Sequence, residues 1–158
     1  MSFFSVVVTG ALATGALLFA AAPTNDPEPS PDLTPEEVIR IQVEALQAND
    51  SPTPDAGIAA AFRFASPGNR AATGPLPRFT QMVKGGYADM LGFASAEYGP
   101  IQVAGDQAQQ AVTLVQRDGR RTVYMFTLGR QRGGRYDGCW MTDGVGERAP
   151  ATNGLRRT

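Results

Sequence analysis

The chain contains no histidine and a single cysteine, Cys139, among its 158 residues. The absence of histidine excludes Ser-His-Asp and Cys-His catalytic arrangements, zinc-protease helices and imidazole bases. One cysteine allows neither an internal disulfide nor a thiolate cage for a metal. We therefore predict no metal site and no cofactor. Cys139, expected on a strand beside Trp140, is interpreted as a small core residue rather than a nucleophile.

Charge is also sparse, at 18% of residues against 42% hydrophobic residues, with a formal net charge of -1. These values are typical of a globular domain. The balanced charge gives no basic surface for nucleic acid, so we predict no nucleic-acid partner. Small groups of arginines flank two expected turns, and we interpret them as solvated strand ends. They are Arg117, Arg120 and Arg121, and Arg130, Arg132 and Arg135.

Residues 3–22 form a long uncharged apolar run that ends in three alanines before Pro23. An apolar middle and an alanine end are typical of a secretory signal, but the first basic residue of the chain is Arg40. The run is also about as long as a minimal membrane span. We expect residues 1–22 to be a cleaved signal peptide or an uncleaved anchor that tethers the protein through residues 3–22. A buried or disordered leader is the third alternative.

Both leading alternatives place the domain outside the cytoplasm, exported to a periplasmic, luminal or secreted location or anchored to a membrane. Residues 23–32 are rich in proline and acidic residues, which predicts an extended linker. We expect the domain to occupy residues 33–142 and a flexible tail to occupy residues 143–158.

Helix signals dominate the first half of the expected domain. Thr34-Pro35-Glu36-Glu37 has the N-cap, the first-turn proline and the capping box of a helix that ends near Asn49. A second helix is predicted from Pro54 or Asp55 to Ala65, stopped by Ser66-Pro67-Gly68-Asn69. A third helix is predicted over residues 77–84, followed by a further helical turn over residues 87–91.

Strand signals dominate the second half. Residues 93–103 predict a first strand interrupted at Gly99-Pro100. Residues 109–141 predict two successive hairpins with two-residue turns at Asp118-Gly119 and Gly133-Gly134. This register places Leu114 opposite Val123 and Thr127 opposite Trp140. The layout is α+β, with N-terminal helices packed on an antiparallel sheet of three to four strands.

In that register both faces of the sheet are apolar, so the face that the helices leave bare needs another cover. One face carries Val112, Leu114, Val123, Met125, Tyr136 and Trp140. The other face carries Val115, Tyr124, Phe126, Leu128, Cys139 and Met141.

Four separated segments carry a resemblance: TPEEVIRIQVEALQAND, FRFASPGNR, PRFTQMVKGGY and GRYDGCWM. Over about Leu33 to Met141 the chain resembles a domain-of-unknown-function family within the nuclear-transport-factor-two-like (cystatin-like) superfamily. It departs from the family pattern at Tyr136, where a tryptophan is expected. The resemblance implies a curved, cone-like sheet around a long helix, a conical pocket and dimerisation through the outer sheet face. Some relatives are isomerases or dehydratases that use a base and a tyrosine in the cone.

We predict a binding or assembly module that acts through a pocket or through its outer sheet face, with a small apolar ligand or a second copy as partner. The pocket residues would be Tyr136, Trp140, Met125 and Val123, and the homodimer interface would use Tyr124, Phe126, Leu128 and Met141. The alternative is a histidine-free isomerase- or dehydratase-like enzyme, whose candidate base and hydrogen-bond donor are Glu97 and Tyr98.

Overall fold

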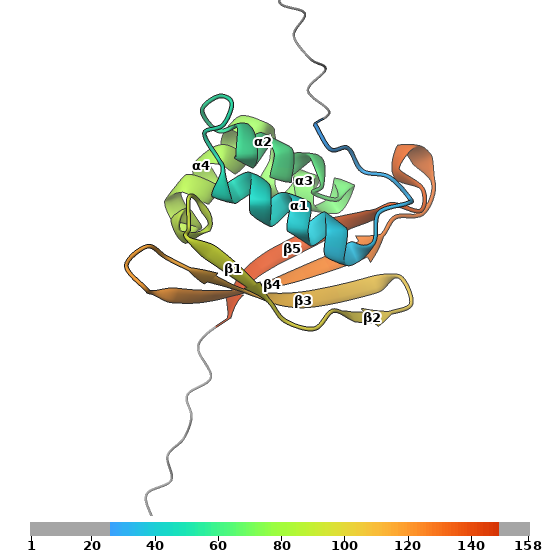
Figure 1. Cartoon of the computed structure of the whole chain (residues 1–158). Helices are drawn as coiled ribbons and strands as arrows, with labels where there is room; N and C mark the ends of the chain where they lie inside the picture. The colour runs from blue at the N-terminus through green and yellow to red at the C-terminus, as the bar shows by residue number, and fades with distance from the viewer. Residues whose placement is uncertain (1–25, 149–158) are drawn as a thin grey trace, which may run out of the picture.

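The computed structural model describes residues 26–148 (Figure 1). The apolar run, residues 23–25 of the expected linker and residues 149–158 of the expected tail lie outside this range. The helices come first in the chain, as predicted, and no helix within the described range is long and apolar enough to cross a bilayer. The helices are α1 (Pro35–Gln47), α2 (Ala56–Arg63), α3 (Pro67–Thr73), α4 (Leu76–Gly86) and the 3-10 turn η1 (Ala88–Met90).

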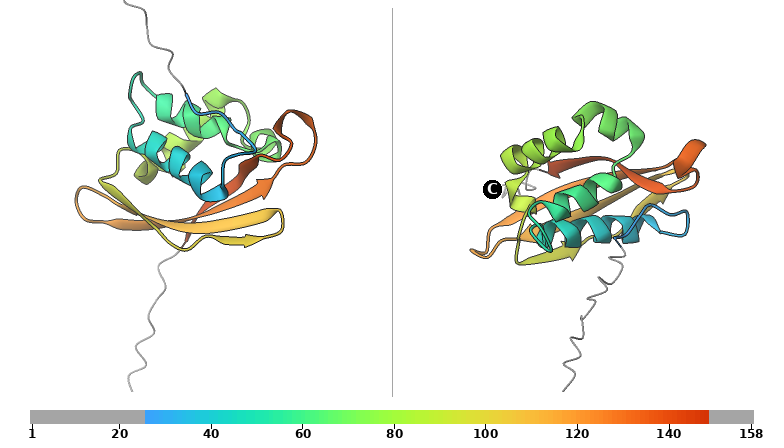
Figure 2. Two further views of the ribbon diagram at one scale, coloured as in Figure 1. Left: turned by 45° about the vertical axis from the view of Figure 1, so that its right-hand side comes forward. Right: turned by 90° about the horizontal axis from the view of Figure 1, so that it is seen from above.

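The strands form one open antiparallel sheet in the order β1-β3-β4-β5, with the short β2 also paired to β3. Their bounds are β1 (Ser95–Tyr98), β2 (Gln102–Ala104), β3 (Gln107–Val115), β4 (Arg121–Arg130) and β5 (Trp140–Arg148). The helices form a layer on one face of the sheet (Figures 1 and 2). The α+β prediction is confirmed, with five strands rather than three or four.

The first helix begins as the sequence predicts. The Thr34 side chain accepts a hydrogen bond from the Glu37 N–H at 3.3 Å, and the Glu37 carboxylate accepts one from the Thr34 N–H at 2.8 Å. This capping box satisfies backbone donors that the first turn leaves free. The apolar stripe of α1 is buried in the core through Val38, Ile39, Val43 and Leu46.

A further helix, α3, starts where the sequence suggests a stop. The Ser66 hydroxyl accepts a hydrogen bond from the Asn69 N–H at 3.2 Å, and Pro67 occupies the first turn. Serine and proline in succession suit an N-cap and a first helical position as well as a turn. The helix ends at Gly74, whose φ of +83° few other residues tolerate.

The register of the first hairpin is shifted by one residue from the prediction. The Gln116 N–H donates to the Arg120 carbonyl at 2.8 Å, so Arg117 lies in the loop with Asp118 and Gly119. Gly119 has a φ of +86°, which suits a three-residue hairpin loop that ends in a left-handed residue. Leu114 therefore faces Thr122, not Val123.

The second hairpin has a much longer loop than the prediction allows. Residues 131–139 leave the sheet and include a 3-10 turn, η2 (Gly134–Tyr136). The Gln131 N–H donates to the Cys139 carbonyl at 2.8 Å and closes this loop. Thr127 therefore pairs with Gly144 instead of Trp140, and β5 continues to Arg148. The prediction of a tail was wrong for residues 143–148.

Because of these two differences in register, several side chains lie on the opposite face of the sheet from the predicted one. Neighbouring residues of a strand point to opposite sides, so a shift of one residue changes the face. The helix-covered face carries Val112, Leu114, Tyr124, Phe126 and Leu128, all buried. The outer face carries Val115, Val123 and Met125, which are partly exposed. The strongly apolar face of the sheet is thus the one under the helices.

Part of the expected linker lies against the helices. Asp26 forms an ion pair with Arg63 of α2 at 3.2 Å, and Glu28 lies 3.8 Å from the same guanidinium. Residues 26–32 therefore follow the surface of the domain rather than only separating it from the leader.

Candidate functional site

A cavity of about 330 Å³ lies between the helix layer and strands β4 and β5. Its walls come from α1 to α4, from Tyr87 just before η1 and Met90 at its end, and from the edge strand β5. This volume is within the range of small-molecule sites. The lining is mainly apolar, with Leu46, Phe79, Met82, Val83, Met90 and Phe126 as its larger side chains.

Small side chains leave this space open. Ala61 near the end of α2, Ala65 just beyond it, and Gly68 and Ala72 on α3 all line the cavity. Protein interiors are close-packed, so small residues gathered around one volume leave room that larger residues would fill. Phe79 of α4 also lines the cavity and contacts Phe62, with their ring centroids 5.0 Å apart.

The base of the cavity carries a buried polar cluster. Gln42 donates from Nε2 to the Ala61 carbonyl at 3.1 Å and accepts from the Thr142 hydroxyl at 2.7 Å. Asn69 donates from Nδ2 to the Thr142 carbonyl at 3.0 Å. Buried polar groups are stable when they are hydrogen-bonded in this way. The cluster joins α1, α2, α3 and β5, and it fixes the shape of the cavity.

Tyr87 lines the cavity just before η1, and its ring packs near that of Tyr124 on β4. The Tyr87 hydroxyl donates to the Val145 carbonyl at 3.3 Å, and the Tyr87 and Tyr124 ring centroids are 6.1 Å apart. Burial, with a smaller contribution from Glu147, raises the pKa of Tyr124 to about 12. Tyr124 is therefore a neutral phenol at physiological pH.

Asp143 is the carboxylate residue that borders the cavity, and it is exposed. Its Oδ2 lies so close to Gly129 that a Cβ on that glycine would be 2.5 Å away. General acid–base chemistry needs a carboxylate within hydrogen-bond reach of the substrate. The Asp143 carboxylate lies instead against the backbone of β4 at Gly129.

The structure separates the predicted catalytic pair. Glu97 belongs to the outer face of β1 and forms two hydrogen bonds with the Arg121 guanidinium, one of them at 3.0 Å. These bonds hold the pKa of the Glu97 carboxyl below its ordinary value, which makes it a weaker base. Tyr98, the next residue, points to the opposite face beside Arg40, and burial raises the pKa of its hydroxyl. The pair cannot act on one substrate.

The four predicted pocket residues are not brought together. Val123 and Met125 lie on the outer face because of the shifted register, and Trp140 is packed into the core. Tyr136 lies in the loop before β5, where its hydroxyl accepts a hydrogen bond from Arg70 at 3.2 Å. No residue of this predicted set lines the cavity under the helices.

The predicted interface residues lie inside the domain. Tyr124, Phe126, Leu128 and Met141 are each at most 2% exposed. The first three face the helices because the hairpin register differs by one residue from the expected one. Phe126, expected at the interface, is instead a wall of the cavity. The homodimer stays a prediction, and these residues cannot form its interface.

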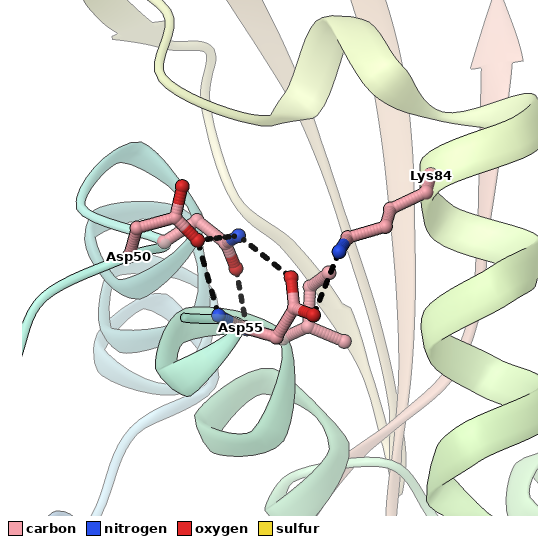
Figure 3. Close-up of polar contacts among 5 residues, drawn as sticks. Asp50, Asp55 and Lys84 are labelled. Atoms are coloured by element: carbon pink, nitrogen blue, oxygen red, sulfur yellow. Dashed lines mark hydrogen bonds and ion pairs between the residues drawn. The ribbon is translucent and has the colours of Figure 1, made fainter. Parts of the chain in front are cut away.

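A second polar cluster connects the turn after α1 to α2 and α4 through hydrogen bonds (Figure 3). Lys84 of α4 donates to the Asp55 carboxylate at 2.7 Å. Asn49 donates to Asp50 at 2.9 Å and to Asp55 at 3.2 Å, and its Oδ1 accepts from the Ile58 N–H at 3.0 Å. The cluster therefore links the turn between α1 and α2 to the last turns of α4. Within residues 26–148, no group of three or more metal-ligating side chains gathers.

Sequence reasoning missed the residues that build the cavity, although one signal was available. Gln42 lies on α1 four residues from both Val38 and Leu46, in the middle of the apolar stripe. A polar residue at such a position needs a buried partner. The identity of that partner, Thr142, depends on a contact that the sequence does not encode locally.

These features define an α+β domain in which helices cover one face of an open antiparallel sheet and enclose an apolar cavity. The chain belongs to the family described as Domain of unknown function (DUF4864), which its residues 30–150 match. No curated protein and no solved structure matches the chain. The wider relation to the nuclear-transport-factor-two-like superfamily stays a prediction.

Proposed function

We propose that the domain is a binding module that takes an apolar group into the cavity between α3, α4 and β5. The observation that carries this proposal is a cavity of about 330 Å³ with mainly apolar walls and a rigid hydrogen-bonded base. Burial of apolar surface is the main source of affinity in such sites, and preformed walls lower the entropy cost of binding.

Binding is favoured over the enzyme alternative by the character of the polar groups. Gln42 and Thr142 bond to each other, and Asn69 bonds to the backbone of β5. Groups occupied in this way hold the site in shape and offer no base to a substrate. The carboxylate at Asp143 is exposed and lies against Gly129.

A substitution at the rim tests the proposal. Ala72 lines the cavity, whereas its neighbour Ala71 does not, and both are exposed on α3. Ala72→Phe should place a ring in the cavity and weaken binding of the apolar dye anilinonaphthalene sulfonate by about tenfold, which corresponds to about 1.4 kcal/mol. The measurement is a fluorescence titration of the full chain.

The matched control is Ala71→Phe, which adds the same ring outside the cavity. It should leave the dye affinity unchanged. Equal dye affinity in the wild type and in both variants, or no dye binding by the wild type, would show that the cavity is not a binding site.

A further inference from the structure

Within residues 26–148, strand β5 has an edge beside the cavity that is mostly unpaired. It is the last strand of the sheet and pairs with β4 on one side. On its other side, the described part of the chain supplies one bridge, between Ala65 and Thr142. A strand edge presents unpaired N–H and C=O groups that accept a further extended chain.

A segment of the same chain already forms backbone hydrogen bonds with this edge. The Thr142 N–H donates to the Phe64 carbonyl at 2.8 Å, and the Ser66 N–H donates to the Thr142 carbonyl at 2.9 Å. At Pro67 the chain turns into α3 and leaves the edge. Among the described residues, this edge thus pairs with an extended segment at Thr142 and has no strand partner from Asp143 onward.

The outward-facing backbone groups of this edge can be assigned to particular residues. The Val145 carbonyl accepts the hydrogen bond from the Tyr87 hydroxyl, so it points away from β4. Orientation alternates along an antiparallel strand, so Glu147, opposite Tyr124, presents its N–H and C=O to the same side. The bond from Tyr87 is long, at 3.3 Å, and a peptide N–H can replace it.

The cavity begins at the same residues. Asp143, Gly144 and Val145 line it from the strand side, and Ala72 and Met82 line it from the helices. A ligand on this edge would therefore have main-chain partners at β5 and an apolar volume directly beside them. Small apolar molecules lack the alternating donors and acceptors that a strand edge matches, whereas an extended peptide has them.

We infer that the ligand is an extended peptide that adds to β5 as a further strand and places an apolar side chain in the cavity. This inference rests on the proposed function, because it uses the same cavity. Main-chain hydrogen bonds to Val145 and Glu147 supply part of the affinity, and the apolar walls select the side chain.

A phage-displayed library of random linear peptides, panned on the full-length protein, supplies the probe. We expect enriched peptides that share an apolar position. A synthetic copy should bind in fluorescence polarisation, and a copy N-methylated at alternate residues, which keeps the side chains but lacks the N–H donors, should bind about tenfold more weakly. The absence of enrichment, or equal binding of both copies, overturns the inference.

Two variants at Glu147 test whether the peptide binds at the edge of β5. Glu147→Pro removes the outward N–H of an exposed edge residue, where proline is tolerated, and Glu147→Ala keeps that N–H. The first should weaken peptide binding about tenfold and the second should not. Circular dichroism and urea unfolding of both variants check that the sheet is intact. Equal peptide affinity of the two variants overturns the inference.

The experiments distinguish a failure of the peptide inference from a failure of the proposed cavity function. If Ala72→Phe weakens dye binding but the peptide results are negative, the cavity binds apolar molecules and the strand addition is wrong. If neither the dye nor the peptide responds to Ala72→Phe, both proposals are wrong.

Discussion

Gly57 is the residue on which the contact between α1 and α2 depends. A Cβ at this position would lie 2.0 Å from the Ala45 carbonyl oxygen and 2.7 Å from the Asn49 Cα. Both are backbone atoms, which cannot move away as the end of a flexible side chain can. The Gly57 N–H also donates to the Asn49 carbonyl at 2.9 Å. The two helices therefore touch through their main chains, and only glycine fits between them.

We expect Gly57→Ala to lower the free energy of unfolding by about 2–3 kcal/mol, because the added methyl forces the helices apart. Gly85→Ala is the matched control, since it lies in α4 with no heavy atom within 4 Å of the added Cβ. It should raise stability by about 0.5–1 kcal/mol through helix propensity. Urea unfolding of both variants measures the difference. Equal effects would contradict the close approach.

Among the helices, α4 contributes little to the core. Val83 is its one buried residue within the described structure, while Met82 is 36% exposed. Its last turns are held by the ion pair from Lys84 to Asp55 (Figure 3). A helix with so little buried surface depends on such contacts for its position, so this pair should also influence the cavity.

The ion pair makes stability depend on pH in a defined direction. Hydrogen bonds from Lys84 and Asn49 hold the pKa of the Asp55 carboxyl below its ordinary value. A lowered folded-state pKa contributes stability above the unfolded pKa of about 3.9, and this contribution is lost as the pH falls through the lowered value. Asp55→Asn should therefore be less stable than the wild type at about pH 7, and the difference should disappear in stronger acid.

Urea midpoints of the wild type and of Asp55→Asn, measured from about pH 7 to about pH 2, test this expectation. Lys84→Gln is the companion variant, because it removes the largest cause of the lowered pKa. The acid-dependent difference should shrink in that background. A difference between wild type and Asp55→Asn that stays constant across the pH range would mean that the ion pair does not stabilise the fold.

For the whole molecule, strand β5 joins the parts of the fold. It pairs with β4 along residues 140–148, and Thr142 bonds to both Gln42 of α1 and the segment before α3. Val145 packs against the core. Residues 143–148 contain little apolar sequence, yet they complete the sheet and border the cavity.

A chain truncated after Thr142 should lose cooperative unfolding, because Tyr124 and Phe126 lose their strand partners on β5. A chain truncated after Arg148 keeps the whole β4–β5 pairing and should unfold in urea like the full-length protein. Circular dichroism during urea titration compares the two. Cooperative unfolding of the shorter chain, with an unchanged midpoint, would assign residues 143–148 to a dispensable tail.

The local signals in the sequence predicted most of the elements. The capping box at Thr34 and the apolar stripe of α1 predicted that helix, and Gly99-Pro100 predicted the break between β1 and β2. The signals failed where one short motif suits two structures. Ser66-Pro67 serves as a helix start as well as a stop, and Asp118-Gly119 ends a three-residue loop as well as forming a two-residue turn.

By itself, the sequence determined the fold class, the order of helices and strands, and the exclusion of histidine catalysis and of an internal disulfide. Composition and short-range periodicity carry that information, because capping, alternation and turn preferences act over a few residues. Only the tertiary structure decided which face of the sheet is buried, since a shift of one residue exchanges the faces. The tertiary structure also forms the cavity. Its small lining residues, and the hydrogen bond between Gln42 and Thr142, come from segments far apart in the chain.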